Sequence, residues 1–225
     1  NFIMAFSVSC LIAFLLTSLF HLEPINTKKS TYLINQVFPF SGGAIYFAAI
    51  AGVFLSISGF ISGYFDNKVK ASSLAYRIQH NKLMSRHISN VKLTKIALFI
   101  EKNLGVYMGN ISLGFFLGSA FLLSYLTPFN IDIRHIAFSS ANVGYGIINH
   151  SFSLTTIALA LGSVLIIGLV NFFVSFSMTF LLVLKSRGLK ISNLRQLIKM
   201  SAKDLLYNPL DYFLIRKKTK GTTSL

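Results

Sequence analysis

Four long apolar runs without a single charged residue constrain the fold of this chain more than any other feature. A helix rises about 1.5 Å per residue, so about 20 apolar residues cross the roughly 30 Å hydrocarbon core of a bilayer. Only 12% of the 225 residues are charged, too few to cover a soluble core of this size. We therefore predict an all-α fold, a polytopic transmembrane helical bundle with about four spans. The predicted spans cover residues 2–20, 44–65, 104–126 and 153–184.

The first run starts at the second residue, and no basic residue precedes it. A secretory signal peptide is the alternative interpretation, but such a peptide has a basic segment before the apolar run and a cleavage site of small residues after it. We expect residues 2–20 to be a span, so that the chain begins inside or just before the membrane.

Lysine and arginine divide the connecting segments into two groups. Segment 66–103 holds eight of them and the tail, 185–225, holds ten, whereas the remaining connections hold three. The positive-inside rule then places both basic segments and both ends of the chain on the cytoplasmic side of the membrane. A fifth span at 133–149 would put the two basic segments on opposite sides, so we expect this segment to re-enter the membrane or to lie at its outer surface.

The basic segments also predict partners and local structure. The net charge of +15 is explained by the lipid bilayer and by anionic lipid beside the basic segments, so we do not expect nucleic acid as a partner. Within 66–103, Leu93, Ile96, Ala97 and Ile100 follow the spacing of one apolar helix face. Residues 191–207 predict a basic amphipathic helix in the cytoplasmic tail.

Small residues recur every four positions in the second and third predicted spans. Residues without a bulky side chain let two helix backbones approach closely, which strengthens their packing in lipid. We expect these motifs to pack the second span on the third, and a homo-oligomer interface is the alternative. The helix-packing residues are Gly52, Ser56, Gly59, Gly63, Gly105, Gly109, Gly114 and Gly118.

Polar residues inside or between the spans are the candidates for a site. Asn110 and Asn171 lie within predicted spans, where polar side chains tend to face the interior of the bundle. The stretch 132–146 is too apolar for a solvated loop and too polar for a span, so we predict a re-entrant element, with an interfacial helix as the alternative. Its candidate polar residues are Asp132, Arg134, His135, Ser139 and Asn142.

Metal and cofactor chemistry receives no support from the sequence. His21, His135 and His150 share the predicted outer side, but their spacing matches no metal-binding pattern. The chain has six acidic residues, no paired carboxylates and no phosphate-binding loop. We therefore expect no metal, no cofactor and no catalytic residue.

Several strings of residues resemble a known family. The most specific are Gly-Tyr-Phe-Asp-Asn-Lys at 63–68 and Asp-Ile-Arg-His at 132–135. Together with the glycine-rich stretch 101–118 and the segment 168–176, they resemble the C-terminal membrane part of the bacterial "site-specific recombinase" family. The resemblance runs from about 44 to 213, and because members of that family are much longer, it implies that this chain is a C-terminal part.

Three functions remain open on this basis. The first is a non-enzymatic membrane domain that anchors, packs or transports. The second is a DNA site-specific recombinase, as the family name implies, with this region as its membrane anchor. The third is a membrane enzyme that acts on lipid and uses Asp132, Arg134 and His135 as its polar cluster.

Overall fold

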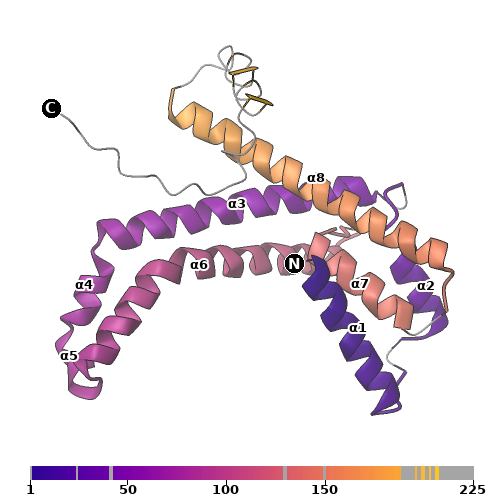
Figure 1. Ribbon diagram of the computed structural model, residues 1–225, viewed down its shortest axis with the longest axis horizontal. Coiled ribbons are helices and arrows are strands. Elements are labelled where there is room, and N and C mark those ends of the chain that lie inside the picture. Colours follow the sequence, from indigo (N-terminus) through magenta and orange to yellow (C-terminus); the bar gives the residue numbers. More distant parts are fainter. Residues whose placement is uncertain are drawn as a thin grey trace. The chain divides into compact units, whose positions relative to one another are not determined.

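The computed structural model describes residues 2–23, 25–40, 43–128, 131–148 and 151–188, together with six positions between 196 and 207. These residues form eight helices and no strand, so the all-α prediction is confirmed for the described part of the chain (Figure 1). The chain divides into two compact units, Asn1–Thr179 and Phe180–Leu225. The helices are α1 Phe2–Ser18, α2 Thr27–Asn35, α3 Ala44–Ala71, α4 Leu74–Gln79, α5 Lys82–His87, α6 Asn90–Leu126, α7 Ile136–Ile148 and α8 Leu154–Ser186.

Three of these helices are long and apolar enough to cross a membrane, namely α3, α6 and α8 with 28, 37 and 33 residues. They contain the predicted spans 44–65 and 104–126 and all but the first residue of the predicted span 153–184. The first predicted span corresponds to α1, which has 17 residues and is thus about 26 Å long, slightly less than a full crossing needs. A fourth crossing by α1 stays a prediction. With 13 residues, α7 is shorter still.

The basic segment between the second and third predicted spans is mostly helical. Helix α3 continues to Ala71, α4 and α5 follow, and α6 begins at Asn90, well before the predicted span. Of the four residues expected on one apolar face, Leu93 and Ala97 are fully buried, whereas Ile96 is 37% exposed. The face is therefore narrower than predicted, because only one side of α6 packs against α3 and α4.

The described residues of segment 21–43 do not form an irregular loop. They contain α2, which begins after Asn26, whose side-chain oxygen accepts a hydrogen bond from the Lys29 backbone N–H at 2.9 Å. This contact satisfies one of the free N–H groups at the start of the helix. Ile34 of α2 and the adjacent Val37 are buried in the main apolar core. The core also contains Ala48 of α3, Val143 of α7, and Ala160, Val164 and Ile167 of α8.

Gly52 and Ser56 of α3 face α8. A Cβ atom at position 52 would lie 2.7 Å from the Cβ of Val174 and 2.9 Å from the Asn171 carbonyl oxygen, so only glycine lets α8 come this close. One turn further along α3, the Ser56 Oγ lies 3.2 Å from the Thr179 Oγ1 at hydrogen-bonding distance.

The first glycine pair of α6 faces α3. A Cβ at Gly105 would overlap the Asp66 carboxylate, and one at Gly109 would lie 2.9 Å from the Ser62 Cβ and 3.2 Å from the Ser58 carbonyl oxygen. On α3 it is thus Ser58 and Ser62, not the neighbouring glycines, that meet α6. A Cβ at any of the other four predicted packing positions would meet nothing within 4 Å among the described residues: Gly59, Gly63, Gly114 and Gly118.

Replacing Gly52 by alanine should destabilise the protein, whereas the same change at Gly59 should not. The new methyl group at position 52 would collide with the α8 backbone, and overpacking of this kind costs about 1–3 kcal/mol. Thermal unfolding of the purified protein in detergent, followed by circular dichroism, measures both variants. Equal melting temperatures for Gly52→Ala and Gly59→Ala would contradict the close approach of α3 and α8.

Candidate functional site

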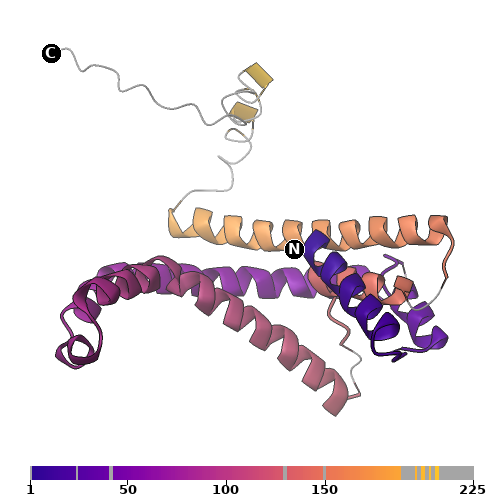
Figure 2. The same cartoon turned by 60° about the horizontal axis from the view of Figure 1, so that its bottom comes forward.

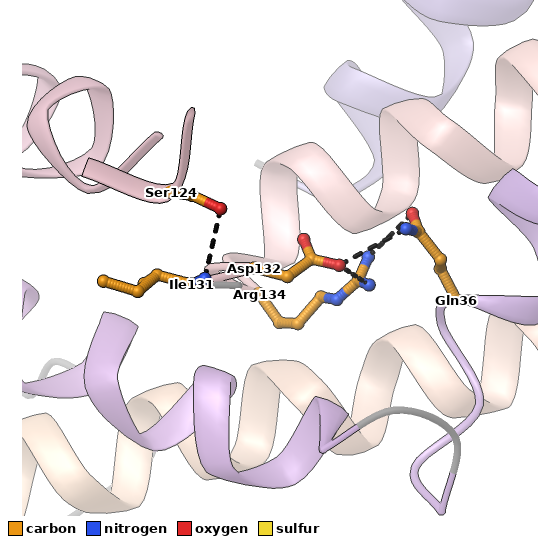
Figure 3. Close-up of polar contacts among 5 residues, drawn as sticks. All are labelled: Gln36, Ser124, Ile131, Asp132 and Arg134. Carbon is orange, nitrogen blue, oxygen red and sulfur yellow. Dashed lines mark hydrogen bonds and ion pairs between the residues drawn. The ribbon is translucent and has the colours of Figure 1, made fainter. Parts of the chain in front are cut away.

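In the membrane unit, Asn1–Thr179, residues 131–135 lead into α7 and carry a cluster of polar side chains. The Ile131 backbone N–H donates to the Ser124 Oγ at 3.1 Å, which fixes the start of the connection on the last turn of α6. The Arg134 guanidinium then pairs with the Asp132 carboxylate through Nη2 and donates to the Gln36 Oε1 through Nη1 at 3.2 Å (Figure 3). The Gln36 Nε2 donates back to the Asp132 Oδ2 at 3.3 Å, which closes a three-residue ring.

Burial makes this ring a strong structural constraint. The side chain of Arg134 is only 6% exposed, whereas that of Asp132 is 43% exposed. Burial lowers the pKa of Arg134 from its ordinary value, and the nearby Asp132 carboxylate opposes this shift. A buried cation without its partner is strongly destabilising, so Asp132 and Gln36 are what make this position of Arg134 possible.

Asn171 of α8 lies on the other side of the same connection. Its Nδ2 donates to the carbonyl oxygens of Ala48 at 2.7 Å and Arg134 at 3.0 Å, and its Oδ1 accepts from the Ile136 N–H at 3.0 Å. The Ile136 N–H is at the first turn of α7, where no helical carbonyl can accept it. One side chain, 2% exposed, therefore ties together α3, α8, the connection and the start of α7.

Among the described residues, His135 contacts the start of α7 and makes no hydrogen bond or ion pair with Asp132 or Arg134. Its ring centre lies 5.9 Å from that of Phe138, and its Nδ1 accepts a hydrogen bond from the Ala137 N–H at 3.4 Å. Burial lowers the pKa of His135, which favours the neutral imidazole at pH 7. Asp132, Arg134 and His135 thus do not form the single polar cluster that a lipid-acting enzyme would need.

A cavity of about 500 Å³ opens beside the Asp132–Arg134 pair. Its wall on one side is α6, where Gly114 and Gly118 present no side chain. The opposite wall of the cavity consists of the α6–α7 connection and the first half of α7. Gly114 and Gly118 thus border a cavity in place of a neighbouring helix. The lining residues are Gly114, Leu117, Gly118, Phe121, Ile131, Asp132, Ile133, Arg134, Phe138, Ser139 and Asn142.

Four of the seven predicted polar residues meet at this cavity: Asp132, Arg134, Ser139 and Asn142. The Ser139 Oγ and the Arg134 Nε are buried and have no hydrogen-bond partner in the described part of the chain. Asn171 is not among the lining residues, but its side chain donates a hydrogen bond to the carbonyl oxygen of Arg134, which is. Asn110 is exposed on α6 and does not belong to the site.

Sequence reasoning missed Gln36 and Ser124, which hold the connection in place. Gln36 is almost a hundred positions away from Arg134, and nothing in its local sequence signals the contact. It also missed Gly144 of α7, where a Cβ would overlap the Ser9 side chain and lie 2.8 Å from the Phe6 carbonyl oxygen of α1. The only local signal was the Gly-x-Gly at 144 and 146.

Among the described residues, no group of three or more His, Cys, Asp or Glu side chains is placed to hold a metal ion. His150, one of the three histidines considered on the outer side, lies outside the described residues. The predicted amphipathic helix at 191–207 is also largely outside them.

The described residues form helices only, and three of these helices are long and apolar enough to cross a membrane. The model of the family described as Site-specific recombinase matches residues 1–214, and the chain belongs to that family. The match includes α1 and α2, which the resemblance noted in the sequence did not reach. No curated protein matches the chain, and no solved structure matches it either.

Replacing Asn171 by alanine should lower stability far more than replacing Asn110 by alanine. The first change removes three hydrogen bonds and leaves the Ile136 N–H buried without a partner, which costs about 1–3 kcal/mol. Asn110 is the matched control because it is the same residue type in another long apolar helix, but exposed. Thermal unfolding in detergent measures both, and a similar loss for the two variants would contradict the central role of Asn171.

Proposed function

We propose that this chain is the membrane domain of a bacterial inner-membrane protein that binds a small molecule in the cavity beside Asp132 and Arg134. The role is non-enzymatic and close to that of a transport or receptor domain. Both basic segments, 66–103 and the tail, face the cytoplasm and contact anionic lipid. The α6–α7 connection and the cavity then lie toward the outer face of the membrane.

The observation that carries this proposal is the convergence of polar side chains from the α6–α7 connection and the first half of α7 on a cavity beside α6. Ligand sites are concave, mostly apolar, and contain a few polar groups in fixed positions. Here the aromatic rings of Phe121 and Phe138 and the glycines of α6 supply the apolar wall, and Asp132, Ser139 and Asn142 supply the polar groups. Ionisable side chains within a membrane have a high free-energy cost, and they commonly mark a site for a substrate or ion.

Access of water to the cavity tests the proposal. In a Cys10→Ser background, cysteine is introduced at Asn142 on the cavity wall or at Phe115, which is on α6 but 70% exposed on its outward face. A charged, membrane-impermeant thiol reagent should modify Asn142→Cys in intact spheroplasts at least about tenfold faster than Phe115→Cys, because only a hydrated thiol ionises and reacts.

The two positions also control for each other. Equally slow modification of both would mean that the cavity is closed to water, and the proposed binding role would fail. Modification of Asn142→Cys only after the cytoplasmic side is exposed would reverse the proposed topology.

The family name supports a second candidate, a DNA site-specific recombinase with this region as its membrane anchor. Such an enzyme needs a serine or tyrosine nucleophile with arginines that stabilise the phosphate in the transition state. In the described residues the nearest arrangement is Tyr207, which is exposed, with the Lys203 Nζ 5.8 Å from the centre of its ring. One lysine beside a tyrosine supports this candidate less strongly than the cavity supports the first.

DNA binding by the purified full chain distinguishes the two candidates. A recombinase should bind a labelled duplex in fluorescence anisotropy with an affinity that falls steeply with salt, and Lys/Arg→Gln changes throughout the tail should abolish binding. The membrane-domain proposal predicts no difference between this variant and one with the same changes in segment 66–103. Selective loss in the tail variant would favour the recombinase.

A further inference from the structure

A second, apolar groove of about 600 Å³ lies between α3 and the C-terminal half of α6. It forms where α6 slants away from α3 beyond the stacked rings of Phe54 and Phe116, whose centres are 5.6 Å apart (Figure 2). Only Ser119 and the hydroxyl of Tyr46 contribute side-chain polar atoms. The lining residues are Tyr46, Phe47, Ile50, Phe54, Phe116, Ser119, Ala120, Leu123 and Ile131.

The groove adjoins the polar cavity. Ile131 lines both of them, and the same stretch of α6 separates them, with Leu117 and Phe121 on the cavity side and Phe116 and Leu123 on the groove side. A polar compartment and an apolar compartment therefore meet at the end of one membrane helix. This combination suits a molecule with a polar head and an apolar tail, which a water-soluble ligand lacks.

The charge of the polar compartment indicates which head it accepts. Both contacts of the Asp132 carboxylate, from Arg134 and Gln36, use Oδ2, and the structure gives Oδ1 no partner among the described residues (Figure 3). Arg134 is buried behind the ring, whereas Asp132 is 43% exposed. Ser139 also lines the cavity, and its hydroxyl is buried without a partner. The cavity thus presents the Oδ1 of Asp132 and the hydroxyl of Ser139 to a ligand, whereas both terminal nitrogens of Arg134 are occupied and only its buried Nε is without a partner.

We propose that the cavity and the groove together bind a lipid with a primary ammonium head group. The head lies beside Asp132, where the three N–H groups of the ammonium match the acceptors of Asp132, Ser139 and Asn142. The rings of Phe121 and Phe138 add cation–π attraction. One acyl chain lies in the groove between α3 and α6. This inference deepens the proposed binding function and rests on it.

Quenching by lipids with brominated acyl chains tests the assignment, since the chain contains no tryptophan. Phe121→Trp places a reporter at the cavity, and Phe115→Trp places one on the outward face of α6 as the control. Nanodiscs contain brominated lipid with an ethanolamine, choline or glycerol head group. The cavity reporter should show a preference for the ethanolamine head, with quenching at least about fivefold stronger than by the other two lipids, since only this head brings a cation with N–H donors to the carboxylate. The control reporter should show none.

Two variants in the Phe121→Trp background locate the binding groups. Asp132→Asn should remove the preference because the anionic acceptor is lost. This change also weakens the contact with Arg134, so Gly118→Leu provides an independent test. A Cβ at Gly118 meets nothing within 4 Å and Gly118 lines the cavity, so leucine there should occupy part of the cavity and also abolish the preference. Phe115→Leu, on the outward face, should leave it unchanged.

The outcomes separate this inference from the proposed function. If Asn142→Cys is accessible to the thiol reagent but both reporters show the same preference, the lipid assignment is wrong and the cavity binds another ligand. A preference for the anionic glycerol head would likewise overturn it.

Discussion

The fold of the membrane unit depends on the hydrogen bonds of one buried amide, that of Asn171. Its three contacts reach α3 at Ala48, the α6–α7 connection at Arg134 and the first turn of α7 at Ile136. In a hydrocarbon environment no water can replace these partners, so each polar group must be satisfied within the protein. The contact to α3 requires a close approach of α8, and Gly52 provides it by having no side chain.

The position of Arg134 follows from that arrangement. With its backbone carbonyl held by Asn171, its side chain extends to Asp132 and to Gln36 beyond α2. The desolvation cost of this buried cation is offset only while both partners stay in place. The ring leaves the exposed edge of Asp132 at the wall of the cavity, so the same contacts that stabilise the connection also shape the candidate site.

The structure divides the small-residue motifs between two uses. Gly105 and Gly109 bring α6 against α3, whereas Gly114 and Gly118, about two and a half turns later, border the cavity on the opposite side of α6. Spacing alone predicts that both pairs can allow a close approach, since the absence of a side chain is a local property. Which pair meets a helix depends on which side of α6 faces α3. That orientation shows only in contacts between residues far apart in the sequence, such as the stacked Phe54 and Phe116.

The sequence by itself determined the helical class and the three longest of its four predicted spans, because these depend on local composition and on the length needed to cross a bilayer. It also indicated the family to which the chain belongs. Only the tertiary structure decided that Asp132 and Arg134 line a cavity, that His135 contacts Phe138 and that Asn110 is exposed on α6. These outcomes depend on contacts across about one hundred residues, above all those of Gln36 and Asn171, and no local pattern encodes them.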